Sequence, residues 1–373
     1  MSNAWYSIEN AAEIDTPALL FYVERIEENL RRTVQIAGGT ARLRPHIKTH
    51  KCAEVLRMQM NAGIEKFKCA TIAEAELAGQ CGVADIMMAY QPTGPKVERF
   101  AKLVERYGLT TRFSCIVDDE SAIRALDAEA RKLLKLIGPF DVFLDVDTGQ
   151  GRTGVVPGTR AVELYRLMAS LPGLKVRGLH SYDGHVKDTD FSARKISCDA
   201  AFARIDGLRR DLIDAGLSVP TIVMGGSPTF PFHAARENVE CSPGTTVFWD
   251  AGMVKNFPDL DFLPAALVMT RVVSKPGGNR LCLDLGHKAV AAEMPQPRVI
   301  FPELTQCNCV MQNEEHLVIE VENADGFAVG DVLYGIPWHV CPTVNLYGEA
   351  RVVREGRAGE AWEIAGRVRR IEI

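Results

Sequence analysis

A lysine in the segment 44–51, RPHIKTHK, offers the clearest chemistry in the chain. An alternating apolar run, residues 41–43, precedes this segment, and a helical pattern, residues 53–62, follows it. In α/β barrels the loops that follow the strands carry the catalytic groups. A lysine that is partly removed from water there exposes a neutral amine, which can form an imine with an aldehyde. We therefore predict that Lys48 binds an aldehyde covalently, with a solvated basic loop as the alternative.

Two glycine-containing loops could bind a phosphate group. The first, residues 225–229, comes directly after the candidate strand 221–224, and the second, residues 242–245, leads into the candidate strand 245–249. Glycines let the backbone approach an anion closely, and amides and hydroxyls can donate hydrogen bonds to it. Phosphate sites of α/β barrels often follow strands seven and eight. Ordinary glycine turns are the alternative. The residues that could contact a phosphate are Gly225, Gly226, Ser227, Thr229, Gly244 and Thr245.

The loop at residues 145–154, DVDTGQGRTG, contains three glycines and one arginine. Such a loop can bend sharply and aim the Arg152 guanidinium into a pocket, where it could hold an oxygen anion. In the alternative arrangement Arg152 pairs with Asp145 or Asp147 and braces the loop.

A cluster of polar and aromatic residues ends the candidate strand 176–182. By strand alternation His180 and Tyr182 share one face, so Tyr182 could lie against an aromatic cofactor. His185 or Asp183 then offers a proton acceptor. A histidine that only packs in the core is the alternative.

A histidine and a cysteine two residues apart could bind a divalent metal. His339 and Cys341 lie in the segment 337–345. In an extended strand, side chains at positions i and i+2 point the same way, roughly 7 Å apart along the backbone. A nitrogen and a sulfur ligand together favour Zn²⁺ over Mg²⁺ or Ca²⁺. A buried cysteine beside a surface histidine is the alternative.

The composition is that of an ordinary globular protein. Of the 373 residues, 47% are hydrophobic and 24% are charged, and the net charge is −5. With no long basic run, we expect no nucleic acid and no anionic membrane as a partner. No stretch reaches the roughly 18 apolar residues that a membrane span needs. Residues 1–15 do not resemble a signal peptide, so we expect the ten cysteines to be reduced thiols in the cytoplasm.

Eight strand candidates separated by helical or turn segments follow an apolar run at 18–23 and a helical pattern at 24–37. This spacing is typical of repeated βα units. It predicts a closed (β/α)₈ TIM barrel over residues 16–255, with an open doubly wound sheet as the alternative. No G-x-G-x-x-G follows an early strand, which argues against a dinucleotide fold. The candidates are residues 41–46, 66–70, 85–90, 113–117, 141–146, 176–182, 221–224 and 245–249.

A second, mostly antiparallel β-domain is predicted for residues 256–373, together with residues 1–15. In this part Gly, Pro and Asn turns separate short β-rich runs, and no convincing helix lies between them. The runs are residues 263–274, 280–285, 316–321, 331–334, 350–354 and 362–371.

The order of these segments resembles that of the fold-type III pyridoxal-phosphate enzymes, and within them the D-threonine aldolase and D-serine dehydratase-like family. The resemblance implies an alanine racemase-like barrel with a C-terminal β-domain, and a homodimer. The matching segments are 15–20 (DTPALL), 44–51 (RPHIKTHK), 147–152 (DTGQGR), 225–229 (GGSPT), 283–288 (LDLGHK) and 339–345 (HVCPTVN).

The resemblance also implies a role for each site residue. Lys48 would hold pyridoxal 5'-phosphate as an internal aldimine, and Arg152 and Tyr182 would line the cofactor. The residues 225–229 would bind its phosphate. His339 and Cys341 would bind the divalent metal, with zinc as the first choice and manganese or magnesium as alternatives. We expect Lys48, Asp183 and His185 to be the catalytic residues.

Two departures bear on the reaction. D-threonine aldolases typically carry an aspartate two places after the metal-binding histidine, whereas this chain has Cys341, as D-serine dehydratases do. Aldolases also tend to read Tyr-His-Gly after the sixth strand, where this chain has Tyr182, Asp183, Gly184 and His185. The base could therefore be His185 or Asp183.

The implied function is that of a metal-dependent lyase acting on a small D-3-hydroxy amino acid, cleaving it to glycine and an aldehyde. The alternative is dehydration of D-serine or D-3-hydroxyaspartate to a keto acid and ammonia. Amino acid racemisation and non-catalytic binding of pyridoxal phosphate are further alternatives.

Overall fold

The computed structural model describes residues 4–373, and the chain divides into two compact units. The parallel-sheet unit comprises Thr33–Lys48, Val55–Gly244 and Ala365–Ile373. The mixed-sheet unit comprises the residues up to Arg32, together with Thr49–Glu54 and Thr245–Ile364. None of the helices that the structure describes is long and apolar enough to cross a membrane.

A seven-stranded parallel sheet forms the centre of the parallel-sheet unit. Its order follows the sequence from β2 to β8, and every neighbouring pair is parallel. Because both faces of a parallel sheet are covered, its strands are largely buried, and β3 and β5 are buried at every position. The strands are β2 (Lys66–Cys69), β3 (Asp85–Met88), β4 (Arg112–Val117), β5 (Phe140–Asp145), β6 (Leu174–Ser181), β7 (Thr221–Met224) and β8 (Val239–Cys241).

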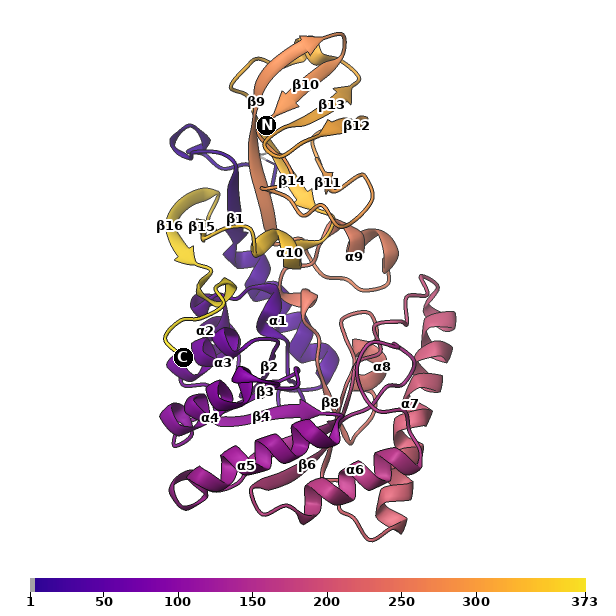
Figure 1. Cartoon of the computed structure of the whole chain (residues 1–373). Helices are drawn as coiled ribbons and strands as arrows, with labels where there is room; N and C mark the ends of the chain where they lie inside the picture. Colours follow the sequence, from indigo (N-terminus) through magenta and orange to yellow (C-terminus); the bar gives the residue numbers. More distant parts are fainter. Residues whose placement is uncertain (1–3) are drawn as a thin grey trace. The chain divides into compact units, whose positions relative to one another are not determined.

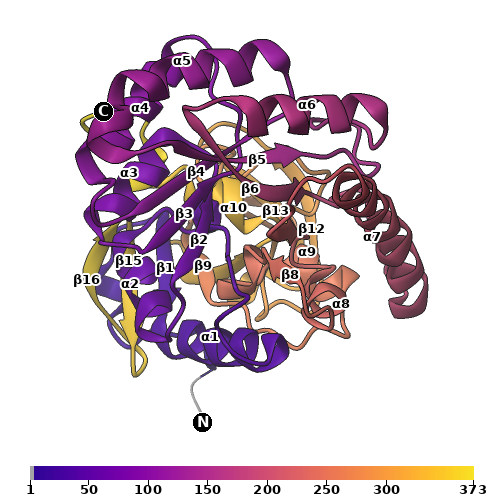
Figure 2. The ribbon, with the colours of Figure 1, turned by 90° about the horizontal axis from the view of Figure 1, so that it is seen from below.

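Helices follow these strands and cover the outer side of the sheet, where Figure 2 shows α3 to α7. Their amphipathic sequences bury one face against the strands. The helices of the chain are α1 (Val23–Ala37), α2 (Ala53–Asn61), α3 (Ile72–Gln80), α4 (Pro95–Tyr107), α5 (Glu120–Ile137), α6 (Thr159–Ser170), α7 (Phe191–Asp214), α8 (Phe230–Ala234), α9 (Ala251–Asn256) and α10 (Val340–Val344).

The segment 41–46 was predicted as the first strand, but it forms only isolated bridges. Leu43 pairs with Cys241 of β8, and His46 pairs with Lys68 of β2. The Lys68 amide donates to the Pro45 carbonyl at 2.9 Å. Pro45 has no amide hydrogen to donate, which limits regular pairing here. The structure thus shows a curled sheet of seven strands, with this segment bonded to both edge strands.

The last predicted strand of the barrel, residues 245–249, is wrong. Residues Thr245–Val247 form a 3₁₀ turn, and the last parallel strand is the earlier and shorter β8. Pro243 and Gly244 interrupt the extended chain between the two.

The mixed-sheet unit contains the second sheet, in which Figure 1 shows β9 as the long strand beside β10 and β14. Its path runs β12-β13-β10-β9-β1-β15-β16, while β14 pairs with β9 and β11 with β14. All these pairs are antiparallel except β1 with β15, so the mostly antiparallel prediction is confirmed. The strands are β1 (Ala18–Tyr22), β9 (Ala266–Gly277), β10 (Arg280–Leu283), β11 (Val299–Ile300), β12 (Cys307–Gln312), β13 (Leu317–Val321), β14 (Val332–Pro337), β15 (Glu349–Arg354) and β16 (Arg357–Glu363).

The N-terminal part of the second sheet extends beyond residue 15, because β1 also pairs in this sheet. Ile8 and Ile14 pack in one core cluster with Leu20 of β1, Met269 and Tyr334. Residues 8–14 therefore share a core with β1, which the sequence pattern assigned to the barrel, and residues 1–3 lie outside the described residues. The sequence of β1 did not indicate which sheet it joins, because both sheets contain apolar strands.

A buried arginine connects the segment 41–46 to two strands of the parallel sheet. The Arg44 guanidinium is bonded to Asp85 of β3 at 2.6 Å and to Glu240 of β8 at 2.7 Å. Its residue is only 2% exposed. Buried carboxylates need such a partner because burial removes them from water.

We expect Arg44→Met to destabilise the protein by about 3 kcal/mol, because it leaves Asp85 and Glu240 without their buried partner. Arg124→Met is the matched control, since Arg124 forms only an exposed pair with Glu120 at 2.8 Å, worth less than about 1 kcal/mol. Urea unfolding of both variants measures the difference. Equal losses of stability would contradict the role of Arg44.

Candidate active site

The predicted cofactor lysine and the first glycine loop meet at the ring of Tyr182. Lys48 is half-buried in the 3₁₀ turn Ile47–Thr49, and its Nζ lies 5.8 Å from the centre of the Tyr182 ring. A Cβ atom added to Gly226 would lie 3.0 Å from the same ring. Two parts of the sequence separated by almost 180 residues therefore contact one aromatic side chain, which follows β6.

Three cationic side chains surround this ring. Besides Lys48, the Arg152 guanidinium carbon lies 5.1 Å from the ring centre, and the Lys68 Nζ lies 6.0 Å from it. In the described part of the chain, no ion pair joins Arg152 to Asp145 or Asp147, so the bracing alternative is not what the structure has. The cluster suits an anionic aromatic ligand.

Lys68 is the residue of this cluster that sequence analysis missed. It ends the alternation Lys66, Phe67, Lys68 in β2, and a lysine in a strand is ordinarily taken for a surface residue. Burial, and then the charge of Lys48, lower the pKa of Lys68 to about 7.

A buried histidine lies close to Lys68. The Nδ1 atom of His180 is 2.7 Å from Oδ1 of Asp145, and its Nε2 atom is buried without a hydrogen-bond partner among residues 4–373. Burial and the charge of Lys68 lower the pKa of His180. His180 is therefore a neutral imidazole that donates to Asp145 and keeps a free acceptor nitrogen.

Asp183 is buried and holds the glycine loop. Its Oδ1 accepts a hydrogen bond from the Thr229 hydroxyl at 2.9 Å, and its Oδ2 lies 2.6 Å from Nε2 of His233. The Arg236 guanidinium lies 2.6 Å from Nδ1 of His233. Because a guanidinium only donates, Nδ1 accepts and Nε2 donates to Asp183. The Thr229 oxygen also accepts from the Gly226 amide at 3.2 Å.

This network bears on the predicted roles of Asp183 and Thr229. Asp183 does not fit as a proton acceptor for a substrate, because it is 1% exposed and each of its oxygens has a donor. Thr229 does not fit as a phosphate donor, because its hydroxyl proton is directed at Asp183. Both residues instead fix the loop. The sequence gave no sign of His233 or Arg236 in this role.

The same network contains a second group that could hold a metal ion. Asp183, Cys198 and His233 place possible ligand atoms within 4.8 Å of one another. The Cys198 sulfur lies 3.5 Å from Nε2 of His233 and 3.7 Å from the Arg236 guanidinium. Since Nε2 carries a hydrogen and a guanidinium stands beside the sulfur, a hydrogen-bond network describes this cluster better than a metal centre.

The second small-residue loop adds further polar groups near the first. The Gly244 amide donates to the Ser227 hydroxyl at 3.1 Å. The Ser242 hydroxyl is buried without a hydrogen-bond partner in the part of the chain that the structure describes. An orphaned buried hydroxyl beside two glycine loops fits a site for an anion. Thr245 begins the next turn and belongs to the mixed-sheet unit.

His185 remains as the candidate base. It is exposed, and a Cβ atom on Gly149 would lie 2.8 Å from its Nε2 atom, so the imidazole packs directly on the loop that carries Arg152. Gly149 also has a φ of +134°, which other residues rarely adopt.

The two predicted metal ligands lie together in the mixed-sheet unit, but not in a strand. β14 ends at Pro337, His339 precedes α10, and Cys341 lies in the first turn of that helix. Burial would lower the pKa of His339, but a hydrogen bond with Cys341 helps to raise it to about 9. The two residues are therefore neighbours in space, as two ligands of one ion must be.

Neighbouring groups orient both of these side chains. The Nδ1 atom of His339 is 2.5 Å from Oε1 of Glu293, and the Cys341 sulfur is 3.3 Å from the Thr49 hydroxyl. The buried Asp250 carboxylate accepts from the Val340 amide at 2.9 Å. A carboxylate on the second ring nitrogen is typical of metal-binding histidines.

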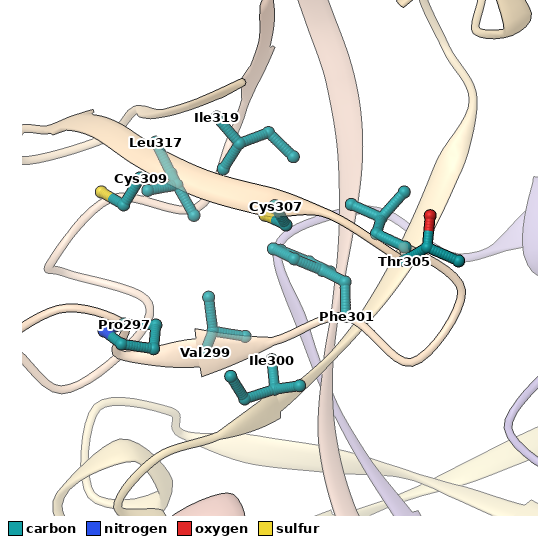
Figure 3. Close-up of a pocket in the computed structure, with 10 residues that line it drawn as sticks. Pro297, Val299, Ile300, Phe301, Thr305, Cys307, Cys309, Leu317 and Ile319 are labelled. Atoms are coloured by element: carbon teal, nitrogen blue, oxygen red, sulfur yellow. The ribbon is translucent and has the colours of Figure 1, made fainter. Parts of the chain in front are cut away.

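A separate pocket in the mixed-sheet unit has a volume of about 210 Å³. Figure 3 shows it lined by apolar side chains, two thiols and Thr305, and it contains none of the candidate site residues. The thiols are Cys307 and Cys309, and burial raises the pKa of both. This pocket therefore lacks the groups that the predicted chemistry requires.

Comparisons with known proteins agree with the two-part architecture. Residues 22–251 match the alanine racemase N-terminal domain, and residues 265–353 match the putative serine dehydratase domain. A D-threonine aldolase from Arthrobacter sp is 31% identical over 363 residues, which are 95% of this chain and 93% of the relative. A D-threo-3-hydroxyaspartate dehydratase from Delftia sp. is 28% identical over 94% of this chain and 97% of the relative.

Among solved structures, the D-threonine aldolase from Filomicrobium marinum superimposes with a TM-score of 0.89 at 28% identity, over 98% of each chain. The alanine racemase domain covers more than half of the sequence, and the Arthrobacter relative is similar over nearly all of it. The chain therefore belongs to the fold-type III pyridoxal-phosphate enzymes with an alanine racemase N-terminal domain, in the family of the D-threonine aldolases and D-serine dehydratases.

Proposed function

We propose that this protein is a lyase that depends on pyridoxal phosphate and a divalent metal and cleaves D-3-hydroxy amino acids to glycine and an aldehyde. The observation that carries the proposal is the meeting of Lys48 and Gly226 at the Tyr182 ring. An amine and an anion-binding loop on one aromatic ring are what an aldehyde cofactor with a phosphate requires. The aldolases among the relatives support the choice of reaction.

The residues around Tyr182 fit the cofactor. Lys48 would hold it covalently, and Tyr182 would lie against its ring. When bound, pyridoxal phosphate withdraws electrons from the substrate Cα. We assign its phosphate to the loop of Gly225 and Gly226, where the backbone can approach an anion closely, and to the hydroxyl of Ser227.

Gly244 and Thr245 are further candidates for the phosphate, and Thr229 acts indirectly by holding the loop on Asp183. We also infer that the segment 41–46, bonded to β2 and β8, completes an eight-part barrel around this site.

His339 and Cys341 would hold the metal, with Glu293 fixing the imidazole. A bound divalent ion lowers the pKa of a hydroxyl that it coordinates. We assign His185 as the base whose imidazole nitrogen would take the proton of the substrate's β-hydroxyl. His185 suits this role because its side chain is exposed beside the loop that carries Arg152. Zinc, the homodimer and the cytoplasmic location stay predictions that come from the resemblance and the composition.

Dehydration is the second candidate, and the cysteine ligand favours it. Cys341 stands where D-threonine aldolases typically have an aspartate, and one relative is a dehydratase. In this reaction the Lys48 amine would take the Cα proton, and the hydroxyl would leave as water.

Product analysis separates the two reactions. With D-threonine and D-serine as substrates, we expect glycine and an aldehyde from D-threonine, and little keto acid from either. Keto acid and ammonia as the main products would overturn the aldolase assignment in favour of the dehydratase.

Lys48→Ala should abolish the visible absorbance of the bound cofactor and reduce activity by several orders of magnitude, because no amine remains to attach it. Lys51→Ala, which changes a lysine of the same motif, is the control and should keep both. A Lys48→Ala protein with an unchanged spectrum would show that another amine holds the cofactor.

Removal of the metal by a chelator should stop catalysis but leave the cofactor absorbance, because the groups around Tyr182 do not include the metal ligands. His339→Ala should likewise lower the metal content of the purified protein to near zero, as measured by elemental analysis. Chelated protein that works at the full rate would refute the assignment of His339 and Cys341.

A further inference from the structure

Lys68 is a buried lysine whose charge has no partner in the described part of the chain. The residue is 3% exposed, and its ammonium forms no hydrogen bond or ion pair there. Lys66, two residues earlier in the same strand, shows the usual arrangement, with its ammonium 2.6 Å from Glu240 and 3.0 Å from the Ala41 carbonyl. An unpaired buried ammonium is costly, so its persistence needs a reason.

The backbone fixes Lys68 beside the cofactor lysine. Its amide donates to Pro45 at 2.9 Å, and it pairs with His46, two residues before Lys48. Its Nζ then approaches the Tyr182 ring to 6.0 Å, close to the 5.8 Å of the Lys48 amine. Two amines from different elements thus reach the same ring.

The carboxylates in the region do not neutralise Lys68. Asp145 and Asp183 act on it only through space, because Asp145 is bonded to His180 and Asp183 to His233 and Thr229. The buried Nε2 atom of His180 also lacks a partner among the described residues. Two unsatisfied polar groups in one buried region point to a ligand that supplies the missing contacts.

We propose that Lys68 is a cofactor-binding residue whose ammonium pairs with the phenolate oxygen of pyridoxal phosphate. This inference rests on the proposed function. In the cofactor, the phenolate oxygen is carried by the ring atom next to the one that bears the aldehyde carbon, so an amine close to Lys48 is suited to it. The phosphate is the other anionic group of the cofactor, and the glycine loop at Gly225 and Gly226 already serves it.

A cation beside the phenolate favours the ionised ring, which absorbs at longer wavelength than the neutral ring. Lys68→Met removes the charge and keeps the length of the side chain. We expect the resting protein, without substrate, to shift from the long-wavelength to the short-wavelength form. The Kd for pyridoxal phosphate should rise tenfold or more, since a hydrogen bond to a charged group contributes about 1.5 to 3 kcal/mol.

Lys66→Met is the matched control, because it removes a lysine from the same strand without touching the ring of Tyr182, and its spectrum should match that of the unchanged protein. If Lys68→Met does not fold, Lys68→Gln gives the same two measurements.

The substrate carboxylate is the competing anion. A resting spectrum and a cofactor Kd that stay unchanged would overturn the proposal, and a raised KM alone would assign Lys68 to the substrate instead.

Failure of the proposed function looks different. If the wild-type protein shows no visible absorbance band after addition of pyridoxal phosphate, the role of Lys48 is overturned, whatever the Lys68 variants do.

Discussion

The buried Asp183 carboxylate is the constraint on which the phosphate loop depends. A carboxylate removed from water must be given donors, and this one receives the Thr229 hydroxyl and the His233 imidazole. Arg236 sets the tautomer of His233, so the direction of the whole chain of hydrogen bonds is determined. The loop geometry follows from it, because the Thr229 oxygen in turn holds the Gly226 amide.

The glycines of this loop are required by the same network. Gly225 has a φ of +95°, and a Cβ atom there would lie 2.5 Å from Cδ2 of His233. Any side chain would displace the imidazole that Asp183 needs. The backbone approach that suits an anion and the buried network behind it are therefore two results of one packing arrangement. The basic side chains of Lys48, Lys68 and Arg152 lie around the ring of Tyr182, which is next to this loop.

The interior of the fold was largely predictable from the sequence, and its irregular parts were not. Strands β2 to β7 are short, mostly buried segments bounded by turns, and they lie close to where the pattern indicated. The predictions failed at residues 41–46 and 245–249, where prolines and glycines break regular pairing. For the site, Lys48 and Gly226 both lie next to the ring of Tyr182, while their roles toward a cofactor stay predictions.

What the sequence could not indicate was the burial of single polar residues. Lys68 and His233 look like surface residues in isolation, and only packing reveals that one is an unpaired cation and the other a link to Asp183. Likewise, the start of a short helix brings His339 and Cys341 together, a geometry that alternation along a strand did not suggest.

The pairing of β1 has a consequence for how relatives of this chain can exchange parts. β1 lies between β9 and β15 in the mixed sheet, although most of the parallel-sheet unit separates it from them in sequence. A recombination event that replaced only the residues after 245 would bring in a sheet without its own central strand. The incoming strands β9 and β15 would then have to pack against a β1 from another protein, so β1 and the residues after 245 have to match each other.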